Sequence, residues 1–147
     1  MKTTIKELKP EAIYPIRHEV LRKGKPFETT FFEGDHDEKT KHFGLILENK
    51  VVGVVSVYKK NCDSFEEKEQ FQIRGMAILE EFQKKGFGKL LIEKAEADCS
   101  KQKADLIWFN ARESAKKFYE NLNYKINGKP FDIENVGLHY IMFKKLK

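Results

Sequence analysis

The feature that most constrains the fold of this chain is a change of apolar period at Gly86. Residues 70–79 combine aromatic and aliphatic side chains as a strand does. After a short polar stretch, apolar residues recur at helical spacing to about Lys103, on a face made of Phe87, Leu90, Leu91, Ala95 and Asp98/Cys99. A strand that passes through a glycine-bearing turn into a helix is typical of a sheet covered by helices.

The rest of the chain fits the same architecture. In the first part of the chain, the sequence predicts a short strand with Ile5 and Leu8, a helix over Pro10–Leu21 and a loop or short irregular helix over 23–41. Two strands follow, over His42–Leu47 and Val51–Tyr58, around a Glu48-Asn49-Lys50 turn; after a polar loop over Asn61–Lys68 comes a strand over Gln70–Leu79. Beyond the central helix, the sequence predicts a strand over Ala104–Asn110, a helix over Ser114–Leu122, and strands over Tyr124–Ile126 and Leu138–Phe143 joined by a loop with Gly128, Pro130 and Gly137. Strands that alternate with helices in the second half require a right-handed crossover between parallel strands. We therefore expect an α/β fold, with a mixed, twisted sheet flanked by helices on both faces.

Length and charge limit the possible classes of protein. A chain of 147 residues without repeats or linkers predicts one domain over 1–147. Residues 1–70 carry 13 basic and 13 acidic side chains, whereas residues 71–147 carry 15 and 10. Because the whole net charge of +5 lies in the second half, we expect an anionic ligand there: a nucleic acid, a membrane surface or a phosphorylated small molecule.

Several classes of protein are disfavoured. No run of about 18 apolar residues could span a membrane, and the N-terminal segment lacks the apolar stretch of a signal peptide. Cys62 and Cys99 are too few for a disulfide framework, and neither belongs to a C-x-x-C pair of a zinc or thioredoxin-type site. These observations predict a cytoplasmic protein whose thiols are reduced.

The turn at the start of the central helix has the properties of a phosphate cradle. The first turn of a helix leaves backbone N–H groups unpaired, and the helix dipole makes that end partly positive. Gly86 and Gly88 lack the Cβ atoms that would keep a phosphate away, and lysines at 84, 85 and 89 add positive charge. The segment therefore predicts a pyrophosphate site.

The spacing of the glycines separates this cradle from two common ones. A Walker loop requires G-x-x-x-x-G-K-[ST], but Leu90 follows Lys89 and no glycine lies five positions before Gly88. A dinucleotide-binding fingerprint requires a third glycine where Leu91 stands. The pattern Q-x-x-G-x-G over Gln83–Gly88 resembles instead the acyl-CoA pyrophosphate loop of the GNAT superfamily of N-acyltransferases.

A second motif extends the resemblance to about residues 42–146. The family continues with a strand and then a helix with the pattern A-x-x-x-Y-x-x-x-G-[FY], to which Ala115, Tyr119 and Tyr124 correspond. Asn123 stands in place of the glycine, and Asn tolerates the left-handed conformation that ends a helix. Many members carry Asn where this chain has Arg112; Asn110 lies two residues earlier and could take a similar ligand-facing role.

The resemblance implies an N-acetyltransferase that moves an acetyl group from acetyl-CoA to a primary amine of a small molecule or peptide, by direct attack in a ternary complex and without a metal. In such a site the backbone of Met76, Ala77 and Ile78 holds the pantetheine arm, with the Ile78 N–H as oxyanion donor. Tyr119 matches the acid that protonates the departing thiolate. The implied acetyl-CoA contacts are Met76, Ala77, Ile78, Gln83, Lys84, Lys85, Gly86, Phe87, Gly88, Lys89, Asn110 and Tyr119.

The general base and the acceptor contacts are less constrained. Candidate bases are Glu28, Glu33, His42, His139 and the cluster Asp35-His36-Asp37-Glu38. The cluster lacks a recognised metal-ligand spacing, and we expect it to be a solvated acidic loop. Arg17 lies on the helix that usually forms the acceptor wall, so we expect Arg17, Glu28, His42 and His139 near the acceptor. An acidic acceptor site would favour a cationic amine.

Two other functions compete with catalysis. Some domains with this fold bind acyl-CoA as sensors without turnover. A nucleic-acid binder would also be basic, but the chain has no RNP, helix-turn-helix or KH motif, and its lysines alternate with glutamates along the predicted helices. We expect an amine acceptor as partner, no nucleic acid or membrane, and possible pairing with a second copy.

Overall fold

The hairpin in the first half of the chain folds as its turn sequence predicts. The computed structural model describes residues 2–146. β2 (Lys41–Leu47) and β3 (Lys50–Lys59) pair antiparallel, and β1 (Thr3–Leu8) pairs antiparallel with β2. Glu48 and Asn49 have φ angles of 50° and 65°, as the two central residues of a tight hairpin turn require. Lys50 belongs to β3, so the turn is one residue shorter than expected.

The described residues form two compact units that share β4 (Gln70–Ile78). Unit 1 comprises residues 1–58 and 73–98, and unit 2 comprises 59–72 and 99–147. The strand order β1-β2-β3-β4-β5-β7-β6 makes one mixed seven-stranded sheet. In it β4 and β5 (Leu106–Arg112) run parallel, whereas the pairs β1–β2, β2–β3, β5–β7 and β6–β7 are antiparallel. The ladder between β4 and β5 covers Gln70–Gln72 of β4. The predicted mixed sheet is confirmed; the prediction of a single domain over 1–147 stays a prediction.

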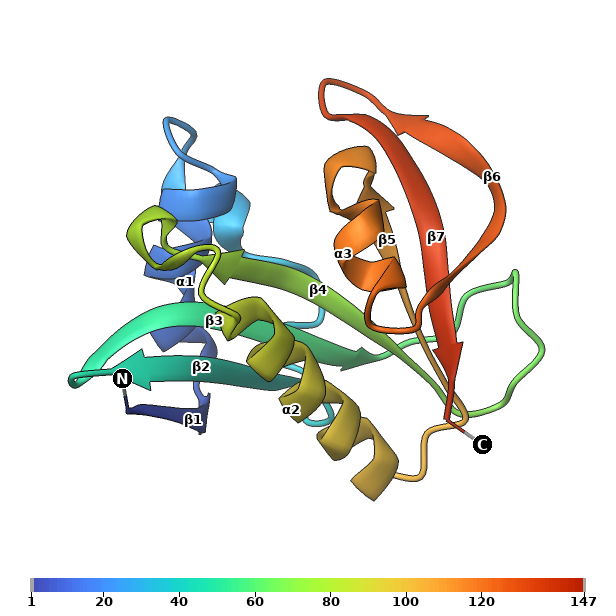
Figure 1. Ribbon diagram of the computed structural model, residues 1–147, viewed down its shortest axis with the longest axis horizontal. Coiled ribbons are helices and arrows are strands. Elements are labelled where there is room, and N and C mark those ends of the chain that lie inside the picture. The colour runs from blue at the N-terminus through green and yellow to red at the C-terminus, as the bar shows by residue number, and fades with distance from the viewer. Residues whose placement is uncertain (1, 147) are drawn as a thin grey trace. The chain divides into compact units, whose positions relative to one another are not determined.

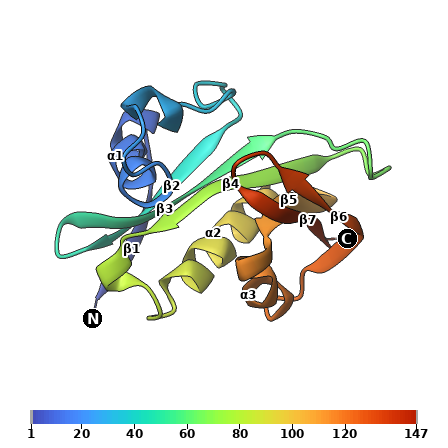
Figure 2. The ribbon, with the colours of Figure 1, turned by 90° about the horizontal axis from the view of Figure 1, so that it is seen from above.

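In unit 1, helices cover both faces of the sheet (Figure 2). α1 (Pro10–Leu21) lies on one face of β2 and β3, and α2 (Phe87–Lys101) lies on the other (Figures 1 and 2). A short 3-10 helix, η1 (Phe27–Thr30), follows α1, and another, η2 (Glu80–Phe82), precedes α2. Pro15 lies inside α1 but leaves the helix unbroken over the predicted residues.

The buried face of α2 differs in one position from the predicted face. Phe87, Leu91, Ala95 and Cys99 are buried as expected, but Leu90 is 39% exposed and Ile92 is fully buried in its place. The helix ends at Lys101, where the pattern predicted about Lys103. The core-facing stripe is therefore rotated toward Ile92.

In unit 2, β5, β7 (Gly137–Lys145) and β6 (Lys125–Ile133) form the end of the sheet. The predicted closing strands were too short, since Gly128 and Pro130 lie inside β6 and not in a loop. The register of β6 against β7 shifts between Asn127 and Phe131, and this irregularity accommodates both residues within the strand.

The helix predicted over Ser114–Leu122 is shorter than expected. It consists of a 3-10 turn, η3 (Glu113–Ala115), followed by α3 (Lys116–Glu120). Asn123 has a φ of 73°, which confirms that it adopts the left-handed conformation usually taken by glycine. Among residues 2–146, no helix combines the length and apolar character that crossing a membrane requires.

Candidate acetyl-CoA and acceptor sites

The predicted phosphate loop connects the end of β4 to α2 and is held by a side chain of its own. The Gln83 side-chain amide donates a hydrogen bond of 2.9 Å to the carbonyl oxygen of Ile78. The nitrogen of the same peptide group is also fixed, because the Leu79 N–H donates to the Val52 carbonyl oxygen at 2.9 Å. The Ile78–Leu79 peptide is thus held at both its oxygen and its nitrogen.

The loop turns into the helix through two left-handed residues. Lys84 has a φ of 61° and Gly86 a φ of 84°. A Cβ atom at Gly86 would meet nothing within 4 Å, so the space beside this backbone is open. α2 begins at Phe87, and its first turn contains no acidic side chain that could compete for the free N–H groups. Lys84, Lys85 and Lys89 are exposed around this helix end. These residues fit an anionic group such as a pyrophosphate.

The middle of β4 opens to the surface of unit 1. Three consecutive residues, Arg74, Gly75 and Met76, are half-buried in a strand that is otherwise mostly buried. Gly75 has a φ of 66°, and a Cβ atom there would lie 3.0 Å from the Arg17 Nε atom. Ala77 is buried and Ile78 is half-buried.

A buried ion pair joins α1 to the segment between η1 and β2. Arg17 is completely buried, and its Nη1 donates at 2.8 Å to Asp35 Oδ2 and at 2.8 Å to the Thr30 carbonyl oxygen. Its Nη2 donates to Asp35 Oδ1 at 3.1 Å, to Ser56 Oγ at 2.9 Å and to the Tyr58 hydroxyl at 2.9 Å. The Arg17 guanidinium therefore links the helix, the loop and β3.

Asp35 is the anion of this pair. The sequence predicts that it lies in a solvated acidic loop, but it is buried. Besides Arg17, it accepts hydrogen bonds from the Tyr58 hydroxyl at 2.5 Å and from the Phe32 N–H at 2.8 Å. Burial alone would raise the pKa of this carboxyl, but these hydrogen bonds and the Arg17 charge hold it below its ordinary value. Its charge is balanced inside the protein, whereas residues 36–38 are exposed.

His42 is buried with both ring nitrogens occupied. Nε2 lies 2.9 Å from the Asp35 carbonyl oxygen, which can only accept, so this nitrogen carries the proton. Nδ1 lies 2.6 Å from Ser56 Oγ and accepts a hydrogen bond from the Ser56 hydroxyl. Burial, together with the Arg17 charge, lowers the pKa of His42 below its ordinary value. The other two expected acceptor residues differ: Glu28 is exposed on η1, and His139 is buried on β7 in unit 2 with Nδ1 2.9 Å from the Gly137 carbonyl oxygen.

Tyr119 and Asn110 belong to unit 2. Tyr119 is half-buried on α3, with its ring centroid 4.3 Å from that of Phe109 and 5.0 Å from that of Phe118. Burial raises the pKa of the Tyr119 hydroxyl to about 12. Within residues 2–146, this hydroxyl has no hydrogen-bond partner. Asn110 is exposed on β5, where it pairs with Ile141 of β7.

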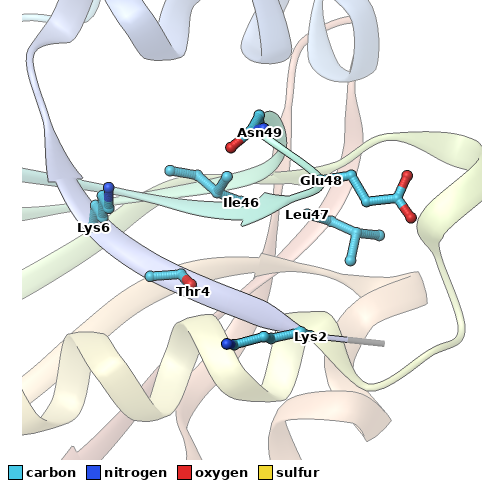
Figure 3. A pocket seen from close by; sticks show the side chains of 7 residues that line it. All are labelled: Lys2, Thr4, Lys6, Ile46, Leu47, Glu48 and Asn49. Carbon is cyan, nitrogen blue, oxygen red and sulfur yellow. The ribbon is translucent and has the colours of Figure 1, made fainter.

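Unit 1 also has a hollow that none of these residues lines. It has a volume of about 380 Å³ and is lined by β1 and the β2–β3 hairpin (Figure 3). Lys6 lies on β1, Lys2 immediately precedes that strand, and Glu48 lies in the hairpin turn (Figure 3). No predicted site residue lines it.

Three site residues were missed in the sequence: Ser56, Tyr58 and Arg74. Ser56 and Tyr58 are the only hydroxyl side chains in the apolar run of β3, and they are two residues apart on one face. Arg74 is the only charged residue of β4. A polar side chain in an otherwise apolar strand is the signal that could have identified all three.

The ion pair makes stability depend on Asp35. Asp35→Asn leaves the buried Arg17 guanidinium uncompensated, and we expect it to lower the free energy of unfolding by about 3–5 kcal/mol at pH 7. Because the folded-state pKa of Asp35 is depressed, its contribution is complete above about pH 4 and is lost as the pH falls through the folded-state value. Urea unfolding at pH 7 and pH 3 should show the difference shrinking in acid. Glu38→Gln, an exposed change in the same loop, should have little effect at either pH; an equal effect of both variants would contradict the assignment.

Comparisons with known proteins agree with this geometry. The family model described as "Acetyltransferase (GNAT) family" matches residues 6–124. YitI of Bacillus subtilis (strain 168), described as an uncharacterised N-acetyltransferase, is 32% identical over 143 residues, which cover 97% of this chain and 96% of YitI.

Solved structures show the same fold at low sequence identity. The crystal structure of Ard1 from Thermoplasma volcanium has a TM-score of 0.79 at 19% identity and covers 100% of this chain and 99% of its own. An aminoglycoside 6'-N-acetyltransferase complexed with coenzyme A has a TM-score of 0.77 at 13% identity, covering 97% and 96% of the two chains. The family model and the full-length relative together establish that this chain is an acyltransferase of the GNAT acetyltransferase family.

Proposed function

We propose that this protein transfers the acetyl group of acetyl-CoA to a primary amine of a small molecule or peptide, by direct attack of the amine in a ternary complex. The observation that carries the proposal is the loop from Gln83 to Lys89. It presents the backbone N–H groups of the first turn of α2, a left-handed glycine beside open space and three exposed lysines at one helix end. The coenzyme A complex of an aminoglycoside N-acetyltransferase with this fold supports acetyl-CoA as the donor.

The chain's residues would hold the donor at two places in unit 1. The N–H groups at Gly86, Phe87 and Gly88, together with the three lysines, bind a pyrophosphate, and backbone groups of Met76–Ile78 bind the arm that carries the thioester. Residues 73–78 of β4 lie outside the ladder with β5, which supports a backbone role for them. The thioester supplies an acetyl group that a neutral amine can attack.

The Ile78 N–H is the proposed donor to the oxyanion that develops during attack. This proposal is supported by the peptide group that follows the Ile78 N–H in the chain. Gln83 and Val52 hold that Ile78–Leu79 peptide group by its oxygen and its nitrogen. A donor that is already oriented does not have to be reorganised during the reaction. Gln83 thus contributes through the backbone of β4.

Tyr119 is the proposed acid for the departing thiolate. Its pKa of about 12 exceeds that of an ordinary thiol by about 3.5 units, so complete transfer would be uphill by about 5 kcal/mol. The proton therefore moves only as the thiolate charge develops, and a hydrogen bond to sulfur provides the remaining stabilisation. The unpartnered hydroxyl of Tyr119 is available for such a bond.

The general base is not His42 in this proposal, because both of its nitrogens are already engaged and its lone pair is directed at Ser56. Glu28 and His139 remain predictions for this role or for acceptor contact. Arg17, which has no exposed surface, is proposed to position the loop and not to touch the acceptor.

The function is tested by measuring free thiol released from acetyl-CoA over a panel of polyamines, amino acids, aminoglycosides and peptide amines. We expect release that depends on at least one class of amine. Binding of acetyl-CoA with no release over the whole panel would support the sensor alternative instead.

The phosphate loop is tested by Gly86→Ala. A non-glycine residue at a φ of 84° is strained by about 1 kcal/mol, and the added methyl group enters the space proposed for phosphate. We expect the Kd for coenzyme A, measured by calorimetry, to rise at least about tenfold. Gly128→Ala is the matched control, because Gly128 has a φ of 80° and equally open surroundings in unit 2. An equal effect of the two variants would argue against the loop.

Tyr119→Phe tests the acid. We expect kcat to fall about 10²-fold, with little change in coenzyme A affinity, because only proton donation is lost. Stability should change little, since the deleted hydroxyl has no hydrogen-bond partner among residues 2–146. Tyr140→Phe, which removes a hydroxyl that interacts with Glu113, serves as the control. Unchanged kcat in Tyr119→Phe would remove Tyr119 from the mechanism.

A further inference from the structure

Arg74 is a half-buried cation without an acidic partner. Its guanidinium carbon lies 4.6 Å from the ring centroid of Phe32 and 5.8 Å from that of Tyr58. Within residues 2–146, these ring contacts are its only interactions, and it forms no hydrogen bond or ion pair. The planar fork of donors on its guanidinium is therefore unused.

Asp35, the buried carboxylate of this cluster, is not available to Arg74. Asp35 is saturated, because it accepts two hydrogen bonds from Arg17 and one each from Tyr58 and Phe32. Arg17 itself lies 4.0 Å from the Phe32 centroid, on which Arg74 also stacks. The guanidinium groups of Arg17, Arg74 and Arg22 thus all lie within 6 Å of the Phe32 ring centroid. Asp35 neutralises Arg17, whereas Arg74 has no ion pair within residues 2–146.

The position of Arg74 connects it to the proposed reaction. It is the first of the three consecutive half-buried residues of β4, and it lies two residues before Met76. Gly75 between them packs against Arg17 and Phe32, since a Cβ atom there would lie 3.0 Å and 3.3 Å from their side chains. The free guanidinium therefore belongs to the same opening of the strand as the backbone proposed to hold the thioester arm.

We propose that Arg74 binds a carboxylate of the acceptor, so that the acceptor is a small amino acid in which one molecule carries both the amine and the carboxylate. Guanidinium and carboxylate groups match in a planar, bidentate arrangement, and stacking on Phe32 holds the guanidinium plane in place. This inference rests on the proposed function and refines its acceptor. A small amino acid takes the place of the purely cationic amine expected from the sequence, because Arg17 neutralises the negative charge of Asp35.

The first experiment compares matched acceptors. Glycine, β-alanine and 4-aminobutyrate would be assayed against their carboxamides by release of free thiol from acetyl-CoA. We expect one of the acids to have a kcat/KM at least about tenfold above that of its amide, with the acetyl-CoA KM unaffected. Amides that react as well as the acids would overturn the inference while leaving the proposed function intact.

The second experiment does not depend on turnover. The acetylated forms of the same three amino acids and their carboxamides would be titrated by calorimetry onto the protein saturated with coenzyme A. We expect a carboxylate to bind at least about tenfold more tightly than its amide, a preference that Arg74→Gln abolishes and Arg74→Lys partly retains.

Arg22→Gln is the matched control, because Arg22 also lies within 6 Å of the Phe32 ring, at 5.5 Å from its centroid. It should retain the preference for carboxylate. Equal losses in Arg22→Gln and Arg74→Gln, or no binding of any carboxylate, would overturn the assignment. Binding of carboxylates without turnover of any amine would contradict the proposed function alone.

Discussion

The buried pair of Arg17 and Asp35 is the interaction on which the acceptor side of unit 1 depends. An isolated charge would be unstable in this interior, so the pair depends on the further hydrogen-bond partners that surround it. Among residues 2–146, the one atom of the pair that is buried without a hydrogen-bond partner is Arg17 Nε. Thr30 on η1 and two residues of β3, Ser56 and Tyr58, supply these partners from two separate segments. The irregular segment between α1 and β2 therefore has one defined path over the sheet, although it contains little regular structure of its own.

The same pair determines which charges face the solvent and any ligand. Asp35 is neutralised internally, His42 is kept neutral by burial, and Arg74 is left as a cation on the open part of β4. In sequence, the acidic residues near position 35 favour a cationic acceptor. In the folded chain Asp35 no longer contributes to that negative charge, because Arg17 neutralises it. The charge of a site depends on which groups are paired as well as on how many are present.

Features set by neighbouring residues could be predicted from sequence. The hairpin turn, the glycine loop before α2 and the left-handed Asn123 follow from conformational preferences over a few residues. The Arg17 cluster could not be predicted, because the side chains and carbonyl that Arg17 binds lie 13 to 41 positions from it in sequence. The sequence also does not show which of several neighbouring acidic residues pairs with Arg17. The extension of β6 over Gly128 and Pro130 was missed for a related reason: the shifted register that admits them is fixed by pairing with β7.

The hydrogen bond from Gln83 to Ile78 has a consequence for how binding energy is used. It joins the loop proposed to grip the nucleotide end of the donor to the peptide beside the proposed oxyanion donor. Contacts made far from the bond that breaks can then set the geometry at that bond, which is how a remote, unreactive part of a substrate contributes to rate as well as to affinity. In this chain a single side-chain amide would carry that coupling.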